Sequence, residues 1–451
     1  NLHASFHTDE GIVRAVRGAS FAVEAGKTLG IVGESGCGKS VAARAMLQLI
    51  QTPGRIDQGE VWLHKSDASD DASIDLAALP PYSTTLRQVR GGDIAMIFQE
   101  PMTAMSPVHT IGQQIIEAVR LHEAMPRKQA RHKAIDLLER VGMPEPSKRV
   151  DAYTFELSGG QRQRAMIAMA IASSPSVLIA DEPTTALDVT TQARILDLLR
   201  DLQQRNGMAL ILITHDLGVV ADMADDVAVM YLGAVVEHAP VNDLFANPKH
   251  PYTKALLASV PTVSLSNHTL LPVIPGNVPS GSHVPQGCAF APRCVEAVAG
   301  LCEQVAPRDV TLGERRVICH LEDPTQTISR EPRARTSSSE QGLEHSATSA
   351  TTASDEVCLA IENVSITYPL YSRGLLRRKI GTTAAVDEVS LTLHAGEALG
   401  LVGESGCGKT SLAHALVRLT PVTSGTVTLH HEATVTNIVR AKGESLRQVR
   451  K

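Results

Sequence analysis

The apolar positions of this chain fall into short runs, which predict strands, and into wider-spaced patterns, which predict helices. Leu29–Val32, Val177–Ala180 and Ala209–Ile213 are each short enough to be one buried strand. Helical patterns cover Val41–Ile50 and Arg162–Ala172. Strands that alternate with helices are typical of an α/β fold.

The longest apolar stretch, Ala165–Ala180, predicts no membrane helix. It is interrupted by Ser173, Ser174 and Pro175, and a spanning helix needs about 20 consecutive apolar residues. We therefore expect that the chain does not cross a membrane by itself. It begins at Asn1 without a Met or a signal-type apolar segment, so we expect the natural start to lie upstream.

An internal repeat organises the chain. Residues 15–40 resemble 385–410, and the seven residues from Gly33 recur unchanged from Gly403. Two further blocks recur in the same order, since 59–64 resembles 425–430 and 86–90 is repeated at 446–450. Three matching blocks in one order indicate two copies of one domain. The second copy stops at Lys451, where the first continues much further, so we expect it to be partial.

The repeat and the composition divide the chain into four parts. We predict a first copy of the repeated domain over 1–246, a small Pro-rich extension over 247–321, a linker over 322–356 and the start of the second copy over 357–451. The linker has almost no large apolar residues, so burial cannot offset its ordering entropy. A chain of 451 residues fits about three domains.

Composition and charge exclude some classes of function. The chain is 43% hydrophobic and 20% charged, as in an ordinary globular protein. Its net charge of -6 gives no basic surface, and aromatic residues make up 3%. Both values argue against a nucleic-acid-binding protein. Trp62 lies on an alternating strand pattern, and we assign it to packing.

A glycine-rich loop between the first strand and the first helix predicts a phosphate site. Backbone N–H groups of such a loop surround phosphate oxygens, and the helix N-terminus adds a favourable dipole. Lys39 would supply charge to the β- and γ-phosphates, and the Ser40 hydroxyl would bind Mg²⁺. The full P-loop pattern appears twice, which makes a ligand-free turn a poor alternative. Its residues are Gly33, Glu34, Ser35, Gly36, Cys37, Gly38, Lys39 and Ser40, and then Gly403, Glu404, Ser405, Gly406, Cys407, Gly408, Lys409 and Thr410.

Two carboxylates end the second apolar strand. Asp181 at the tip of a buried strand beside a P-loop is suited to the Mg²⁺ shell. Successive strand side chains alternate, so Glu182 points elsewhere, where it would accept a proton from an attacking water. An acidic pair at a strand end is by itself a common surface feature. The P-loop elsewhere in the same domain favours the functional interpretation of this pair.

A third anion site is predicted at the start of the second helical pattern. Ser158, Gly159, Gly160 and Gln161 precede it, and a serine at a helix start with flanking glycines presents free N–H groups. The apolar stripe that follows is assigned to core packing. Taken together, these motifs resemble the nucleotide-binding domain of ABC transporters, over nearly all of 1–321 and again from about 357.

This resemblance implies a fold and further roles. The fold would be a P-loop NTPase of the ABC-ATPase type, with a RecA-like core, an antiparallel β subdomain and a helical subdomain. Gln99 resembles the Q-loop glutamine that contacts Mg²⁺ and water, and His215 resembles the switch histidine at the γ-phosphate. Phe6 and Tyr368 are candidates for stacking on adenine, although a core aromatic is about as good an interpretation of Phe6. By the repeat, Thr410 would bind Mg²⁺ in the second site.

In this family ATP lies between the P-loop of one domain and the signature of another. The resemblance therefore implies pairing of the two nucleotide-binding domains within the chain, with the signature at Ser158–Gln161 opposite the second P-loop. The first P-loop would need a signature from the second copy, which these residues lack. We expect weak ATP hydrolysis by these 451 residues unless two first-copy domains pair.

Four of the seven cysteines crowd into the extension, at Cys288, Cys294, Cys302 and Cys319. Four thiolates so close suit tetrahedral Zn²⁺ or a [4Fe–4S] cluster, and unligated buried cysteines are the alternative. The spacing does not choose the metal. Residues 247–261 and 287–294 resemble the C-terminal extension of oligopeptide/dipeptide importer ATPases, and that resemblance implies [4Fe–4S] rather than zinc, in a structural or a redox-sensing role.

The resemblance implies an ATPase that powers peptide uptake through two transmembrane permease subunits, with a peptide-binding protein outside and this chain on the cytoplasmic face of the cell membrane. Residues 100–122 would receive a permease helix. Importers of nickel, glutathione or another small solute are an alternative. A soluble ABC ATPase of the translation-factor or DNA-repair type is the second alternative, and the low charge and the extension weigh against it.

Overall fold

The computed structural model describes residues 1–64, 73–185, 187–260, 272–326, 356–371, 378–404, 406–431 and 434–450. The chain divides into two compact units, which we describe separately. Unit 1 comprises Asn1–Leu187 and Thr191–Arg335, and unit 2 comprises Thr336–Lys451 with Asp188–Thr190. Most of the predicted linker, and Ser405 of the second P-loop, lie outside the described residues.

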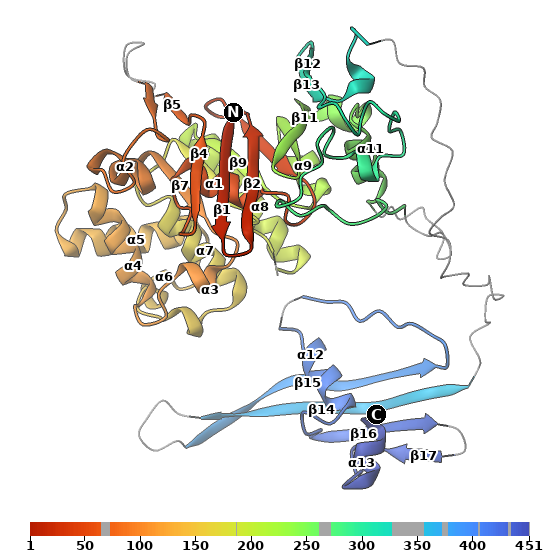
Figure 1. The fold of residues 1–451 in the computed structure, drawn as a ribbon. Coiled ribbons are helices and arrows are strands. Elements are labelled where there is room, and N and C mark those ends of the chain that lie inside the picture. The colour runs from red at the N-terminus through yellow and green to blue at the C-terminus, as the bar shows by residue number, and fades with distance from the viewer. Residues whose placement is uncertain are drawn as a thin grey trace. The chain divides into compact units, whose positions relative to one another are not determined.

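An eight-stranded sheet forms the centre of unit 1 (Figure 1). Its order is β12-β13-β11-β10-β3-β9-β8-β7. The five strands from β10 to β7 run parallel, and every residue of β3, β7 and β9 is buried. Strands covered on both faces have continuous apolar runs. The three strands predicted from such runs are confirmed as β3, β8 and β9. The bounds are β3 Thr28–Val32, β7 Ile94–Ile97, β8 Val177–Asp181, β9 Ala209–Ile213, β10 Asp226–Tyr231, β11 Ala234–Pro240, β12 Asp309–Leu312 and β13 Arg315–Ile318.

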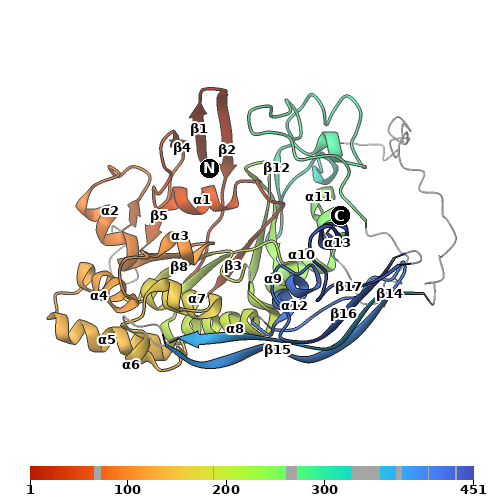
Figure 2. The same ribbon diagram turned by 90° about the horizontal axis from the view of Figure 1, so that it is seen from below.

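The helices of unit 1 cover this sheet and extend beyond one edge. Figure 1 shows α4 to α7 gathered near β7, and Figure 2 shows the same helices side by side. The apolar faces of α4, α5 and α7 share one core with α8. Helix α1 packs in a second core with β3 and the antiparallel strands. The bounds are α1 Lys39–Met46, α2 Thr84–Gln88, α3 Pro101–Ala104, α4 Ile111–His122, α5 Arg127–Arg140, α6 Pro146–Arg149, α7 Gly159–Ala170, α8 Val189–Asn206, α9 Leu217–Met223, α10 Val241–Ala246 and α11 Pro251–Ala258.

The extension continues the same sheet and the same core. Strand β13 pairs with β11, so the hairpin β12–β13 extends the sheet beyond the strands of the first nucleotide-binding domain, which we call the cassette. Tyr252 and Phe290 of the extension pack against Val32 and Tyr231 in one buried cluster. The extension is therefore built onto the edge of the sheet nearest to β10, and residues of the cassette form part of its hydrophobic core.

Smaller antiparallel elements complete unit 1. A three-stranded sheet has the order β2-β1-β4, and β5 pairs with β6. Their bounds are β1 Leu2–Thr8, β2 Gly11–Ala19, β4 Gly54–Gln58, β5 Trp62–His64 and β6 Ser73–Asp75. The assignment of Trp62 to packing was wrong: its side chain is 52% exposed, because the buried face of β5 belongs to Leu63.

Unit 2 is an antiparallel sheet with two helices. The strand order is β15-β14-β16-β17, with β14 Val357–Tyr371, β15 Lys379–His394, β16 Ser424–His431 and β17 Thr434–Asn437. The helices are α12 Lys409–Leu416 and α13 Glu444–Val449. Leu399–Val402, the counterpart of β3, forms no strand, and Val402 is exposed. Within the described part of unit 2 this segment has no parallel strand beside it. No helix in the described parts of the chain combines the length and the apolar character needed to cross a bilayer.

Candidate nucleotide-binding site

The first P-loop connects the carboxyl end of β3 to α1. Gly33 and Gly38 have φ angles of 150° and 100°, where an L side chain is strained. A Cβ atom at Gly33 would lie 2.2 Å from the carbonyl oxygen of Met230, and one at Gly38 would lie 2.2 Å from that of Ala15. The glycines thus allow the loop to fold tightly against its neighbours, and α1 begins directly behind it.

Lys39 is held inside this loop. Its ammonium donates hydrogen bonds to the carbonyl oxygens of Gly33, at 2.8 Å, and Glu34, at 3.1 Å. The side chain is buried. A cation fixed at the mouth of a helix N-terminus is suited to bind phosphate oxygens.

Ser40 and Asp181 meet behind the lysine. The Ser40 hydroxyl donates a 2.9 Å hydrogen bond to Oδ1 of Asp181. Asp181 is fully buried, its Oδ2 has no hydrogen-bond partner, and burial raises the pKa of this carboxyl. A buried carboxylate oxygen beside a hydroxyl is the donor set that Mg²⁺ prefers, so these two residues fit a magnesium site.

Three loops at the carboxyl ends of β7, β8 and β9 converge on Glu182. Gln99 donates from Nε2 to Oε2 of Glu182 at 3.0 Å, and Nδ1 of His215 lies 3.4 Å from Oε1. Thr185 donates to Oε2 at 2.8 Å. Thr185 belongs to none of the sequence motifs; it reaches Glu182 because it lies three residues later in the same turn.

The environment of Glu182 favours its ionised form. Burial alone would raise its pKa, but hydrogen bonds from Thr185 and His215 and the charge of Lys39 lower it. The side chain is 15% exposed, whereas that of His215 is 65% exposed. Glu182 has a φ of 47°, a strained left-handed conformation for a residue with a side chain. An ionised carboxylate held in this way is suited to accept a proton.

The signature residues lie at the N-terminus of α7. Ser158 caps the helix, since its Oγ accepts a hydrogen bond from the N–H of Gln161, and its own N–H donates one to Oε1 of Gln161. Gly159 and Gly160 form the first turn. The exposed helix start leaves N–H groups directed outward, as an anion site requires.

The remaining predicted nucleotide contacts lie on other elements. Phe6 is on β1, paired with Val13 and Gly54, and is partly buried. Tyr368 is on β14 of unit 2 and partly exposed. In the second P-loop Lys409 donates to the carbonyl oxygens of Gly403 and Glu404, both at 2.6 Å. The described residues of that loop, Gly403, Glu404, Gly406, Cys407, Gly408, Lys409 and Thr410, repeat the first loop locally, with α12 beginning behind Gly408.

The four cysteines of the extension are gathered in one region with free thiols. The N–H of Cys288 donates to the carbonyl oxygen of Cys302 at 2.7 Å, and Cys294 packs beside both. Burial raises the pKa of Cys294 and of Cys319 to about 12, and the neighbouring thiols add to the effect. Among the described residues no group of three or more His, Cys, Asp or Glu side chains is arranged to hold a metal ion.

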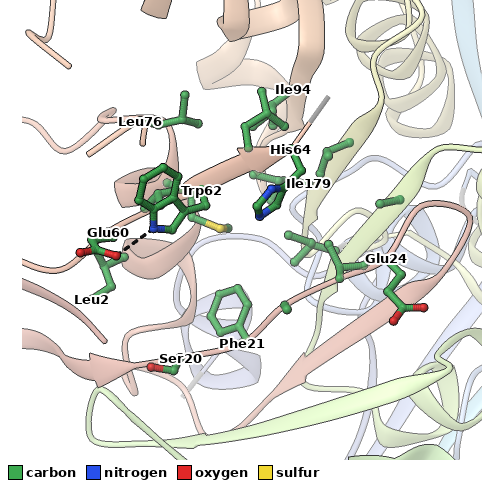
Figure 3. A pocket seen from close by; sticks show the side chains of 18 of the residues that line it. Leu2, Ser20, Phe21, Glu24, Glu60, Trp62, His64, Leu76, Ile94 and Ile179 are labelled. Carbon is green, nitrogen blue, oxygen red and sulfur yellow. Dashed lines mark hydrogen bonds between the residues drawn. The ribbon is translucent and has the colours of Figure 1, made fainter. Parts of the chain in front are cut away.

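A pocket of about 800 Å³ opens elsewhere in unit 1. Figure 3 shows Phe21, Trp62 and Ile179 on its walls, with the Trp62 indole donating to Glu60. Val177 and Ala209 begin β8 and β9, so the pocket lies at the amino ends of the parallel strands. The P-loop lies at their carboxyl ends, where open α/β sheets bind ligands.

Comparison with known proteins agrees with this geometry. Residues 16–185 and 386–451 match the ABC transporter family, and residues 236–302 match the oligopeptide/dipeptide transporter C-terminal region. The chain is 41% identical over 430 residues to an oligopeptide transport ATP-binding protein of Mycobacterium tuberculosis, covering 95% of this chain and 67% of the relative. It is 50% identical over 307 residues to a probable peptide ABC transporter ATP-binding protein of Sinorhizobium fredii (68% and 89% covered). It is also 47% identical over 308 residues to an oligopeptide transport ATP-binding protein of Bacillus subtilis (68% and 83%).

Proposed function

We propose, from the premise that this chain belongs to the ABC transporter family, that it drives the uptake of short peptides through membrane permeases. Family membership makes it a P-loop ATPase with the ABC-ATPase fold. The observation that carries the peptide assignment is the extension. Residues 236–302 match an oligopeptide/dipeptide transporter region, and this segment is built into the sheet and core of the cassette.

We assign the chemistry of the first site to the residues that converge on it. Lys39 binds the phosphates, and the signature at Ser158–Gln161 of one cassette closes on the P-loop of another. Ser40 and Asp181 hold Mg²⁺, with Gln99 beside them. When bound, the metal ion neutralises the charge that develops on the phosphate oxygens.

Glu182 is assigned as the general base of hydrolysis. Its ionised carboxylate accepts the proton of the water that attacks the γ-phosphate, while Gln99 and Thr185 fix its orientation. His215, more exposed and close to the same carboxylate, is placed to reach the γ-phosphate. A base held by two donors remains in one rotamer, which preserves alignment with the water.

The surface after Gln99 is assigned to the permease contact. Met102 and Val108 expose their apolar side chains there. Nearby, Tyr153 and Phe155 are also exposed, with their rings stacked at 5.5 Å, and Thr154 between them donates to the carbonyl oxygen of Ser106. Exposed apolar residues gathered beside the catalytic loop suit a helix from a membrane subunit. This contact would hold the chain at the cytoplasmic face of the membrane.

We also propose that Cys288, Cys294, Cys302 and Cys319 bind a metal group, a [4Fe–4S] cluster rather than zinc. Three of the four free thiols, those of Cys288, Cys294 and Cys302, lie in one cluster, which supports the assignment. Among the described residues the thiols are not arranged to hold a metal ion, so binding would require them to move. A thiol must lose its proton to bind a metal, and the raised pKa of Cys294 and Cys319 means that metal binding would have to supply the free energy of deprotonation. The [4Fe–4S] cluster would fasten the extension to the edge of the sheet.

The proposal is tested by co-purification and by ATPase stimulation. We expect the full transporter to contain two membrane permeases, and peptides delivered by its external binding protein to stimulate ATP hydrolysis. Stimulation by nickel or glutathione and not by peptides would reassign the cargo. Stimulation by ribosomes or DNA without permeases would favour a soluble ABC ATPase.

A further inference from the structure

Two residues of the extension hold Glu34, the second residue of the first P-loop. Arg293 makes a bidentate ion pair with it, with Nη1 2.7 Å from Oε2 and Nη2 2.9 Å from Oε1. The Tyr252 hydroxyl accepts a 2.8 Å hydrogen bond from the Glu34 N–H. The extension is therefore hydrogen-bonded to both the side chain and the backbone of the same P-loop residue.

The arginine is fixed before any nucleotide binds. Its side chain is 4% exposed, against 26% for Glu34. Its Nε donates to the carbonyl oxygen of Pro275 at 2.9 Å, and its guanidinium lies 5.9 Å from the ring centre of Tyr231. A guanidinium group whose Nε, Nη1 and Nη2 are all hydrogen-bonded holds a carboxylate in one orientation.

Electrostatics gives this pair a consequence for nucleotide binding. Glu34 is an acidic residue in a loop that must receive a polyanion, and like charges at short range in a partly buried site repel strongly. Arg293 neutralises this charge and keeps the carboxylate turned toward the extension. Without Arg293, the loop would present a free negative charge beside the phosphates.

We propose that Arg293 is a positioning residue for ATP binding: by neutralising and orienting Glu34 it makes the first P-loop competent for phosphate. The extension thereby acts on the first ATP site, a role beyond the proposed peptide transport. The inference depends on nucleotide binding alone and not on the identity of the cargo. Glu139, an exposed glutamate on α5 and outside both P-loops, serves as the control.

The test measures the affinity of the full chain for the magnesium complex of a non-hydrolysable ATP analogue by calorimetry. A Lys409→Ala background weakens the second P-loop so that the signal reports the first. We expect Arg293→Met to weaken binding about tenfold, from the uncompensated charge of Glu34. We expect Arg293→Lys, which keeps the charge, to stay within about threefold.

The deciding variant is the double substitution Arg293→Met with Glu34→Gln. Removing the carboxylate removes the repulsion, so we expect it to recover the affinity of Glu34→Gln alone to within about twofold. Glu139→Gln should leave the affinity unchanged. A purely structural role of Arg293 predicts no recovery, because the extension would remain loosened.

Three results would overturn the inference: unchanged affinity in Arg293→Met, a double variant as weak as Arg293→Met, or a tenfold loss in Arg293→Lys. If Arg293→Met does not fold, as judged by circular dichroism, Arg293→Lys and the double variant still decide. No permease or peptide is present in the assay, so an error in the cargo assignment would leave these results unchanged.

Discussion

The side-chain amide of Gln99 donates a 3.0 Å hydrogen bond to the carboxylate of Glu182. Gln99 follows β7 and Glu182 follows β8, so this bond joins the loops of two neighbouring parallel strands. The Q-loop leads directly into the exposed apolar residues assigned to the permease. A displacement of that loop would therefore reach the carboxylate assigned as the base through one hydrogen bond.

Replacing Glu182 by glutamine should stop hydrolysis and preserve binding. Glutamine keeps the shape and can still pair with Thr185, but it cannot take a proton. We expect kcat for ATP to fall by about 10²–10⁴-fold with analogue affinity within about twofold. The exposed Glu139 provides a matched control, since Glu139→Gln should be indistinguishable from wild type. Near-normal turnover by Glu182→Gln would remove Glu182 from the role.

The hydroxyl of Thr185 should shift the pH profile of hydrolysis. Its bond lowers the pKa of Glu182, and a base works only when ionised. Thr185→Val removes the donor, so the pKa of Glu182 rises and the acidic limb of the kcat profile moves to higher pH. Thr185→Ser keeps the donor and should restore the wild-type profile. An acidic limb that does not move in Thr185→Val would show that this bond does not tune the base.

Asp181 should show opposite effects on stability and on activity. Burial raises its folded-state pKa, so the ionised carboxylate weakens the folded state at every pH above its unfolded pKa, and this cost is relieved only as pH falls. Asp181→Asn removes that cost. We expect a thermal midpoint at or above that of wild type in metal-free buffer at neutral pH, with Mg²⁺-dependent ATPase activity lost.

The measurement is a thermal melt with and without Mg²⁺, beside an ATPase assay. Ser40→Ala, which removes the partner of Asp181, is the comparison, and it should lower both the midpoint and the activity. A clear loss of stability in Asp181→Asn without metal would contradict this account of the site.

The cysteine assignment predicts a defined metal content. Protein purified without oxygen should contain about four irons per chain and absorb near 400 nm if the group is [4Fe–4S]. Cys302→Ser should lose it, whereas Cys358→Ser, on β14 of unit 2, should not. One zinc per chain without iron would show that the bound metal is zinc, and absence of both metals would show that the four thiols are free.

The Tyr252 hydroxyl should stabilise the first unit through the P-loop. Tyr252→Phe leaves the Glu34 N–H without its acceptor, and an unsatisfied buried donor costs about 1–3 kcal/mol. We expect the free energy of unfolding of Tyr252→Phe to be lower by that amount, which is measured as a lower midpoint in denaturant. Tyr82→Phe, at a highly exposed tyrosine, is the control and should have no effect. Equal stability of both variants would show that water replaces the hydroxyl.

The elements that local pattern determines were predictable from the sequence. The apolar runs of β3, β8 and β9 and the glycine loop before α1 each need only a few neighbouring residues. The limit appears at Leu399–Val402, which resembles β3 and precedes the same loop. Strand β3 forms because β9 and β10, far along the chain, pair with it on either side. The sequence of a short segment does not show whether such partner strands are present.

The site was predictable to the same extent. Its motif residues could be named one at a time, and the structure brings Gln99, Glu182 and His215 together. Thr185 has no periodicity to reveal it. Arg293 lies 259 residues from Glu34, and neither residue type nor spacing could pair them. Contacts between distant segments depend on the packing of the whole sheet.

Peptide uptake into proteoliposomes tests the central claim most directly. The vesicles contain the permeases, the full-length ATPase subunit and the binding protein, with ATP on the side of the ATPase. We predict that a labelled short peptide accumulates with the wild-type chain and does not accumulate with Glu182→Gln. Uptake that proceeds equally with Glu182→Gln, or ATP-driven accumulation of another solute with no peptide uptake, would contradict the account.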